Sequence, residues 1–199
     1  MNENYEMDLA RLYKTCIANV DELMCDQTTN EKTIFAQING TPITVRLTRE
    51  LRFPHSNCAP NLGSNHKVRS ILVTVGVTKA PSNNHVIVIL LHEFAHALEM
   101  IKRTEEEWLK AERMETLRLA YHYEYDEVLE YFLEREATAW TNGYRLAEEA
   151  GLDVGSVYFS ISKKILGIAT KKYGERAETV LVHFAEKQKM NYFRGGKKI

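Results

Sequence analysis

The sequence predicts an α+β fold in which an N-terminal helix and a small antiparallel or mixed sheet precede a half made of helices. Two observations predict it: the apolar residues change from helical spacing to alternation and back along the chain, and none of the four prolines lies beyond Pro81. The chain has 199 residues, 44% of them hydrophobic, and no internal repeat. This size and composition fit a single globular domain over residues 1–199.

The first 65 residues predict a helix, a hairpin and a loop, in that order. Apolar residues recur at helical intervals from about residue 5 to residue 24. Two alternating runs, at 33–39 and 43–48, meet at Asn39-Gly40, a dipeptide favoured in two-residue hairpin turns. Two prolines, a glycine and several asparagines in residues 51–65 indicate a loop.

The remainder predicts one strand followed by helices. Residues 70–77 are rich in β-branched side chains and predict a well-buried strand. Pro81-Ser82 then supplies a break and a helix cap, after which the apolar spacing stays helical. We expect residues 70–147 to form the core that carries the chemistry, and residues 148–199 to add C-terminal helices and a basic tail.

Composition and termini narrow the classes of function. The formal net charge of −1 gives no reason to expect nucleic acid or an anionic membrane as a partner. The N-terminus lacks the pattern of a signal peptide, and the longest apolar run, 86–91, is too short to span a bilayer. Three cysteines without CxxC spacing indicate reduced thiols. We therefore expect a cytoplasmic protein, in a host cell if the gene belongs to a phage; the oligomeric state stays open.

The motif that carries chemistry is HExxH, formed by His92, Glu93 and His96. Residues four apart on a helix lie on one face, one turn apart, so the two imidazoles can converge on one cation. The glutamate beside the first histidine lies at the rim of such a site, where it can take a proton from water. The motif therefore predicts one catalytic Zn²⁺ per chain, with Glu93 as the general base.

A catalytic zinc site needs a third protein ligand. The downstream candidates are side chains that carry a carboxylate or an imidazole: Glu99, His122, Asp126, Glu127, Glu130, Glu134 and Glu136. At 100° per residue, Glu136 lies in the middle of an apolar stripe, where a carboxylate is costly unless it is paired or binds a metal. Glu130 and Glu134 lie off that stripe. Glu136 is the preferred ligand and His122 the second choice, while Glu99 is expected to support a histidine or pair with Arg103.

These residues resemble a known group of enzymes. HEFAH, followed some forty positions later by Glu134-Arg135-Glu136-Ala137-x-x-Trp140, looks like the gluzincin pattern of zinc metallopeptidases. The likeness is nearest to the ImmA/IrrE-like metallopeptidases of bacteria and phages, and covers mainly residues 70–147. It implies a zincin-like fold, the zinc ligands His92, His96 and Glu136, and Glu93 as general base. The motifs are further apart than in that family, which predicts an inserted helix near residues 104–120.

The predicted activity is peptide hydrolysis, on a protein or peptide substrate with a narrow, regulatory role. The strand at 70–77 is the candidate for holding an extended substrate by main-chain hydrogen bonds. Tyr144 is the preferred donor to the oxyanion; Tyr123, Tyr158 and His183 are the other possible donors. His55, His66 and His85 are expected at the surface.

Two other functions remain open from the sequence. The first is a non-catalytic, zinc-stabilised interaction module on a peptidase fold. The intact Glu93 favours catalysis over it, because a binding module needs no general base. The second is hydrolysis of a bond other than a peptide bond, since function depends on the site and its pocket rather than on the fold.

Overall fold

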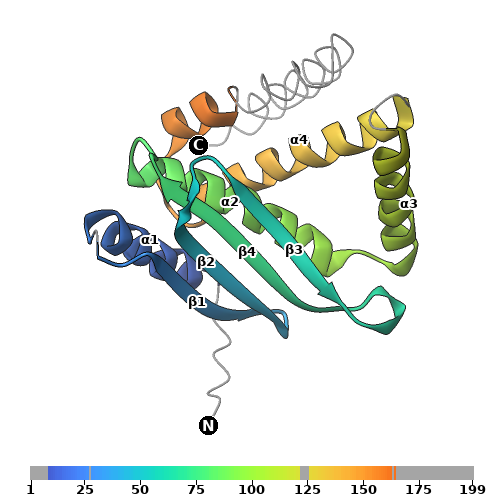
Figure 1. Ribbon diagram of the computed structural model, residues 1–199, viewed down its shortest axis with the longest axis horizontal. Coiled ribbons are helices and arrows are strands. Elements are labelled where there is room, and N and C mark those ends of the chain that lie inside the picture. Colours follow the sequence, from blue (N-terminus) through green and yellow to red (C-terminus); the bar gives the residue numbers. More distant parts are fainter. Residues whose placement is uncertain (1–8, 27, 122–125, 163, 165–199) are drawn as a thin grey trace, which may run out of the picture.

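The computed structural model describes residues 9–26, 28–121, 126–162 and 164. A helix, a four-stranded mixed sheet and a set of helices follow one another along the chain (Figure 1). The structure therefore confirms the α+β class. The elements are α1 (Leu9–Cys25), β1 (Glu31–Ile38), β2 (Thr41–Arg52), β3 (Ser56–Leu62), the short 3₁₀ helix η1 (Ser64–His66), β4 (Val68–Thr78), α2 (Asn83–Lys102), α3 (Glu105–Tyr121) and α4 (Asp126–Glu149).

The strands lie in the order β1-β2-β4-β3. β1 and β2 are antiparallel and form the expected hairpin, with positive φ at Asn39 (49°) and Gly40 (73°), as a two-residue turn of this kind requires. β4 runs parallel to β2 and antiparallel to β3. The predicted strand at 70–77 is thus an inner strand, with neighbours on both of its edges.

Residues 51–65 are not a loop, as their composition predicted. They contain the end of β2 and the whole of β3, which pairs with β4 from Ser56↔Val75 to Leu62↔Val68. β3 lies at the edge of the sheet, where Pro60 is tolerated because an edge strand can do without one backbone donor. Pairing with the apolar β4 outweighs the weak strand preference of the asparagines.

One face of the sheet packs against α1 and α2 (Figure 1). Inward-facing side chains alternate along the strands, so Val45 and Leu47 of β2 and Val73 and Val75 of β4 are fully buried. The opposite face carries exposed residues such as Phe35, 71% exposed. Because only one face of the sheet is covered by helices, α2 lies in the middle of the core, between that face and α4.

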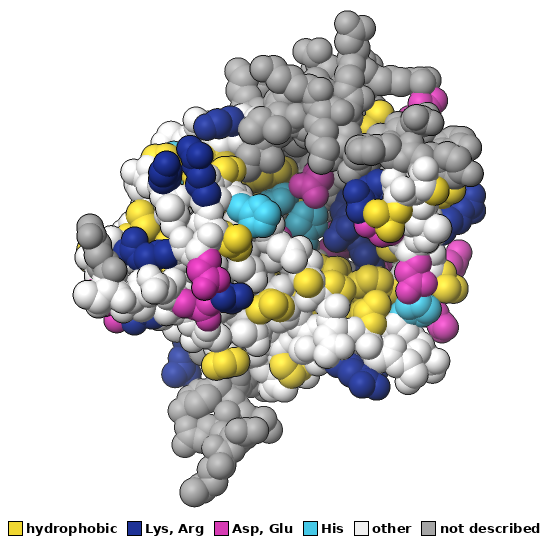
Figure 2. Space-filling model, viewed as in Figure 1, with side chains coloured by type: hydrophobic (Ala, Val, Ile, Leu, Met, Phe, Trp, Pro, Cys, Tyr) yellow, Lys and Arg dark blue, Asp and Glu magenta, His cyan; other side chains and the backbone are white. Residues whose placement is uncertain are grey.

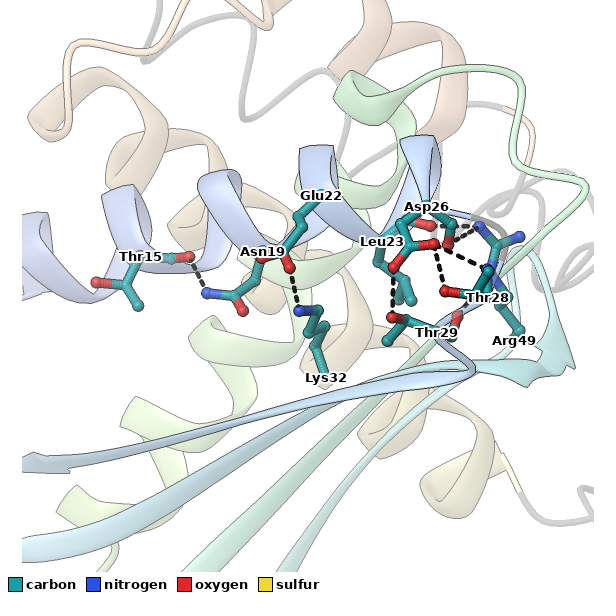
Figure 3. A network of polar contacts seen from close by, with 9 residues as sticks. All are labelled: Thr15, Asn19, Glu22, Leu23, Asp26, Thr28, Thr29, Lys32 and Arg49. Atoms are coloured by element: carbon teal, nitrogen blue, oxygen red, sulfur yellow. Dashed lines mark hydrogen bonds and ion pairs between the residues drawn. The ribbon is translucent and has the colours of Figure 1, made fainter.

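A dense polar network joins the end of α1 to β1 (Figure 3). The Asp26 carboxylate accepts hydrogen bonds from the backbone and hydroxyl of Thr28 and from the hydroxyl of Thr29. The Arg49 guanidinium, from β2, donates to the carbonyl oxygens of Leu23, Asp26 and Thr29. Carbonyl oxygens at a helix C-terminus lack hydrogen-bond donors within the helix, and the Arg49 guanidinium is such a donor here.

The helical half begins at Ser82, which occupies the N-cap position of α2 but places its hydroxyl 2.8 Å from His85 Nδ1 and makes no side-chain cap bond. The inserted helix expected near 104–120 is α3. Beyond α4, residues 155–162 are helical. The rest of the expected C-terminal helices, the basic tail, His122, Tyr123 and His183 fall outside the described residues. None of the described helices has the length and apolarity needed to cross a membrane.

Candidate metal centre

Helix α2 carries His92, Glu93 and His96, and all three are buried, with 5–6% of each residue exposed. The helix is buried on every side from Val86 to Ala97 because α1 and the sheet pack against it on one side and α4 on the other. Three polar side chains in such a helix need partners, since burying an unpaired polar group costs free energy.

Helix α4 supplies the partner. Glu136 faces the two histidines, and Leu133 and Trp140, its neighbours on the predicted stripe, are buried. The two helices approach closely at Gly143, where a Cβ would lie 2.6 Å from the hydroxyl of Tyr158 and 3.0 Å from the carbonyl oxygen of Leu91. The absence of a side chain at Gly143 therefore lets α4 lie against the turn that holds His92.

The geometry of this trio fits a tetrahedral metal ion. Nε2 of His92 lies 3.3 Å from one carboxylate oxygen of Glu136, and Nε2 of His96 lies 3.3 Å from the other. Two ligands of one tetrahedral zinc, each at roughly 2.0–2.1 Å, lie roughly 3.3–3.4 Å from each other. Charge-assisted hydrogen bonds are shorter, at roughly 2.7–2.9 Å. Two imidazoles and one carboxylate, with their ligand atoms within 4.8 Å of one another, therefore form a group that could hold a metal ion, and zinc accepts donors of these kinds.

Glu136 differs from its prediction in one respect. Its side chain is 43% exposed, because the carboxylate points into a cleft and is not enclosed by the apolar stripe. Burial acts to raise the pKa of Glu136, but His92 and His96 outweigh this and hold that pKa well below its ordinary value. Glu130 and Glu134 are exposed, as expected.

Glu99 lies behind His96, with Oε2 3.8 Å from Nδ1 of the imidazole. Arg103 donates a 2.6 Å hydrogen bond to Oε1 of Glu99, which is the pairing expected from the sequence. Burial acts to raise the pKa of Glu99, but His96, Arg103 and Arg135 outweigh it and lower that pKa to about 2. Burial likewise acts to lower the pKa of His96, but Glu136 and Glu99 raise it to about 9.

Trp140 determines how the His92 ring lies. The two rings stack with centroids 4.1 Å apart and planes at 21°, while the Trp140 carbonyl accepts the hydroxyl of Tyr158. The face of an aromatic ring therefore lies against the first imidazole. His96 packs edge-on against His92, with ring centroids 4.6 Å apart.

The trio opens into a cleft of about 470 Å³ between α2, α4 and the start of β3. On the face drawn in Figure 2, histidine side chains gather in a hollow near the middle of the molecule, beside acidic and basic side chains. The described residues that line the cleft are Pro54, Ser56, Asn57, Cys58, Ile89, His92, Glu93, His96, Arg135, Glu136 and Trp140.

Ser56 touches the predicted general base: its hydroxyl donates a 2.6 Å hydrogen bond to Oε1 of Glu93. Sequence reasoning missed Ser56, together with Cys58 and Arg135. Ser56 and Cys58 lie in the segment interpreted as a loop, and no local pattern marks their approach to α2. Arg135 had a signal, since it adjoins the third predicted ligand, but sequence gave no reason to prefer it to a solvated arginine. Burial raises the pKa of the Cys58 thiol.

The structure does not bring Tyr144 into this cleft. Its ring packs against Tyr158 and Phe159, with centroids 5.3 Å away in both cases, and it is not among the described lining residues. Tyr158 is buried behind Trp140. Of the three histidines expected at the surface, His55 is exposed and His85 half-buried, while His66 lies 3.0 Å from Glu112 of α3.

Comparison with known proteins adds no family to this description. No protein-family model, curated protein or solved structure matches the chain. The resemblance to gluzincins therefore depends on the motif residues.

Proposed function

We propose that this protein is a zinc-dependent peptidase in which His92, His96 and Glu136 bind the metal and Glu93 is the general base. The observation that carries the proposal is the pair of 3.3 Å separations between the imidazole nitrogens and the two oxygens of Glu136. Two chain segments some forty residues apart supply these atoms, so the arrangement is a property of the fold and not of the HExxH helix alone.

Zinc held by these residues supplies Lewis acidity, which polarises a carbonyl group and makes water easier to deprotonate. Residues of the chain transfer the proton and hold the reacting groups in place. Glu93 removes the proton from the attacking water and delivers it to the leaving amine. Ser56 holds Oε1 of Glu93 by its hydrogen bond and so fixes the direction of the carboxylate. Trp140 keeps the His92 ring in one plane.

An extended substrate fits along β3 better than along β4, the strand suggested by the sequence. Both edges of β4 are paired, whereas β3 has β4 on one side and no described strand on the other. Ser56, Asn57 and Cys58 of β3 line the cleft. A peptide added to this edge would form main-chain hydrogen bonds beside the histidines.

The order of elements agrees with the zincin-like plan implied by the motif. A mixed sheet precedes the HExxH helix, and a separate helix brings the third ligand. We extend the proposal to the ImmA/IrrE-like type, and to a protein substrate with a regulatory role, on the strength of the Glu134-to-Trp140 pattern.

The test compares the wild-type chain with Glu93→Gln, which keeps the shape of the side chain but removes its basicity. Both proteins should bind about one zinc per chain, because Glu93 is not a ligand. Cleavage by the variant should fall about 10²–10⁴-fold, the usual contribution of a general base. Metal analysis gives the first quantity, and mass-spectrometric mapping of new N-termini in a proteome treated with each protein gives the second.

Glu130→Gln is the matched control, since Glu130 is an exposed glutamate of α4 outside the cleft. It should match the wild type in both assays. A wild-type protein that binds zinc but generates no Glu93-dependent N-termini would refute the peptidase and leave the interaction module and hydrolysis of another bond. A folded wild type that binds no zinc would refute the metal site itself.

A further inference from the structure

Arg135 is a charged residue of the cleft that the proposed reaction does not use. It precedes Glu136 on α4, lines the cleft beside the two histidines, and has a side chain only 25% exposed. It also lines a second cavity, of about 1070 Å³, bounded by α2, α3, α4 and the β1–β2 turn. Arg135 therefore borders both the cleft and a larger space.

The buried nitrogen of the Arg135 guanidinium makes no hydrogen bond within the described chain. Its Nε is buried and has no hydrogen-bond partner there, and the nearest carboxylate oxygen, Oε2 of Glu99, is 3.8 Å away. That distance is too long for a hydrogen bond. Glu99 has a closer partner than Arg135, because Arg103, whose side chain is 6% exposed, binds it at 2.6 Å.

The charges around the cleft leave room for an anion. Three carboxylates, those of Glu93, Glu99 and Glu136, lie near two guanidinium groups, those of Arg103 and Arg135. A divalent cation at the histidines leaves one positive charge in excess. A largely buried guanidinium without a close partner is unfavourable, and its planar fork matches a carboxylate with two parallel hydrogen bonds.

We propose that Arg135 binds a carboxylate of the substrate beside the bond that is cleaved. The proposal rests on the proposed peptidase function and adds a specificity to it. The carboxylate belongs either to an aspartate or glutamate side chain or to the C-terminus of the substrate. In the side-chain case, the cavity beyond Arg135 accommodates the continuing peptide chain.

The test uses the full chain loaded with Co²⁺, because thiolate binding to cobalt gives a charge-transfer band and needs no turnover. The probes are mercaptoacetyl amino acids in two matched pairs. One pair compares glutamic acid amide with glutamine amide, and the other compares free alanine with alanine amide. In one of the pairs, the wild type should bind the probe with the carboxylate about 10–100-fold more tightly, as expected for a charge-assisted hydrogen bond.

Arg135→Gln should abolish that preference, and Arg135→Lys, which keeps the charge but loses the planar fork, should retain part of it. Arg145→Gln is the control: it is exposed and lines the larger cavity but not the cleft, so it should keep the wild-type preference. The pair that shows the preference identifies the source of the carboxylate.

Three results overturn the inference. The wild type shows no preference in either pair, or the preference survives in Arg135→Gln, or both Arg135 variants lose the fold and with it the cobalt, which would make Arg135 a structural partner of Glu99. A wild type that binds no Co²⁺ is a different failure, because it refutes the proposed metal site itself.

Discussion

Two polar regions of this small domain differ in how far the protein itself satisfies the hydrogen bonds of their charged side chains. At the α1–β1 junction, Asp26 and Arg49 direct their hydrogen bonds to neighbouring backbone and hydroxyl groups. In and beside the cleft, some buried atoms have no hydrogen-bond partner in the described chain: Nδ1 of His92 and of His96, Oε2 of Glu99 and Nε of Arg135.

This difference in hydrogen bonding indicates which region stabilises the fold and which region is available to a ligand. A polar network that is satisfied by the protein stabilises the fold and has nothing left to offer a ligand. Buried polar atoms without partners lower stability, so their retention calls for an explanation such as a bound ion or substrate. The junction should therefore contribute mainly to stability, and the cleft mainly to binding.

The largest expected effect is on metal binding, from Glu136→Gln. Loss of one of three ligands should weaken zinc at least about 100-fold, or about 2.7 kcal/mol, because changing even a residue behind a ligand costs 10–100-fold. Glu134→Gln, two residues earlier and exposed, should leave the affinity unchanged. A competition titration with a chromophoric chelator measures both, and circular dichroism verifies the fold. Equal zinc affinity in the two variants would remove Glu136 from the site.

The next effect is on stability, from Arg49→Met at the junction. The variant leaves the carbonyl oxygens of Leu23, Asp26 and Thr29 without their donor. Unsatisfied, partly buried groups of this kind should lower the free energy of unfolding by about 2 kcal/mol. Urea denaturation of the chelator-treated protein measures the loss, and zinc affinity should stay the same. The comparison would fail if Arg49→Met weakened zinc as strongly as Glu136→Gln does.

A control for Arg49 lies three residues further along β2. Arg52 is exposed, so Arg52→Met should change the free energy of unfolding by less than about 0.5 kcal/mol. A loss as large as that of Arg49→Met would mean that general charge, and not the three carbonyl contacts, determines the effect.

The sequence predicted more of the cleft than of the α1–β1 junction. The spacing of His92 and His96, and the position of Glu136 on its helix, follow from helical periodicity, which is local and survives folding unchanged. The turn at Asn39-Gly40 was visible for the same reason, because φ > 0 is a local demand that few residues meet. These features can be predicted without knowing which elements pack together.

The missed features depend on contacts between distant segments. β3 has the composition of a loop and is a strand because β4 pairs with it. Ser56 reaches Glu93 through that pairing, across 37 positions of sequence. Arg49 reaches the carbonyl oxygens of Leu23 and Asp26 at the end of α1 across more than twenty positions. No periodicity within one segment encodes such contacts, so neither network could be predicted from the sequence.

The smallest expected effect is on the acid stability of the junction, through Asp26. Hydrogen bonds from the hydroxyls of Thr28 and Thr29 and from the backbone of Thr28 lower the pKa of Asp26 to about 2. A carboxyl group whose pKa is lower in the folded state stabilises the fold above its unfolded pKa, about 3.9, and loses that contribution as the pH falls through the folded value. Stability should therefore decline between about pH 4 and pH 2.

Asp26→Asn should remove this part of the decline, because the variant has no carboxylate to protonate. Urea denaturation at pH 6 and at pH 3 measures it as a smaller difference between the two midpoints than in the wild type. Thr29→Val, which removes one of the donors, should reproduce part of the change by raising the pKa of Asp26 towards its ordinary value. An Asp26→Asn protein with the wild-type difference would show that the junction's bonds do not depend on charge. The contrast with the cleft would then depend on hydrogen-bond geometry alone.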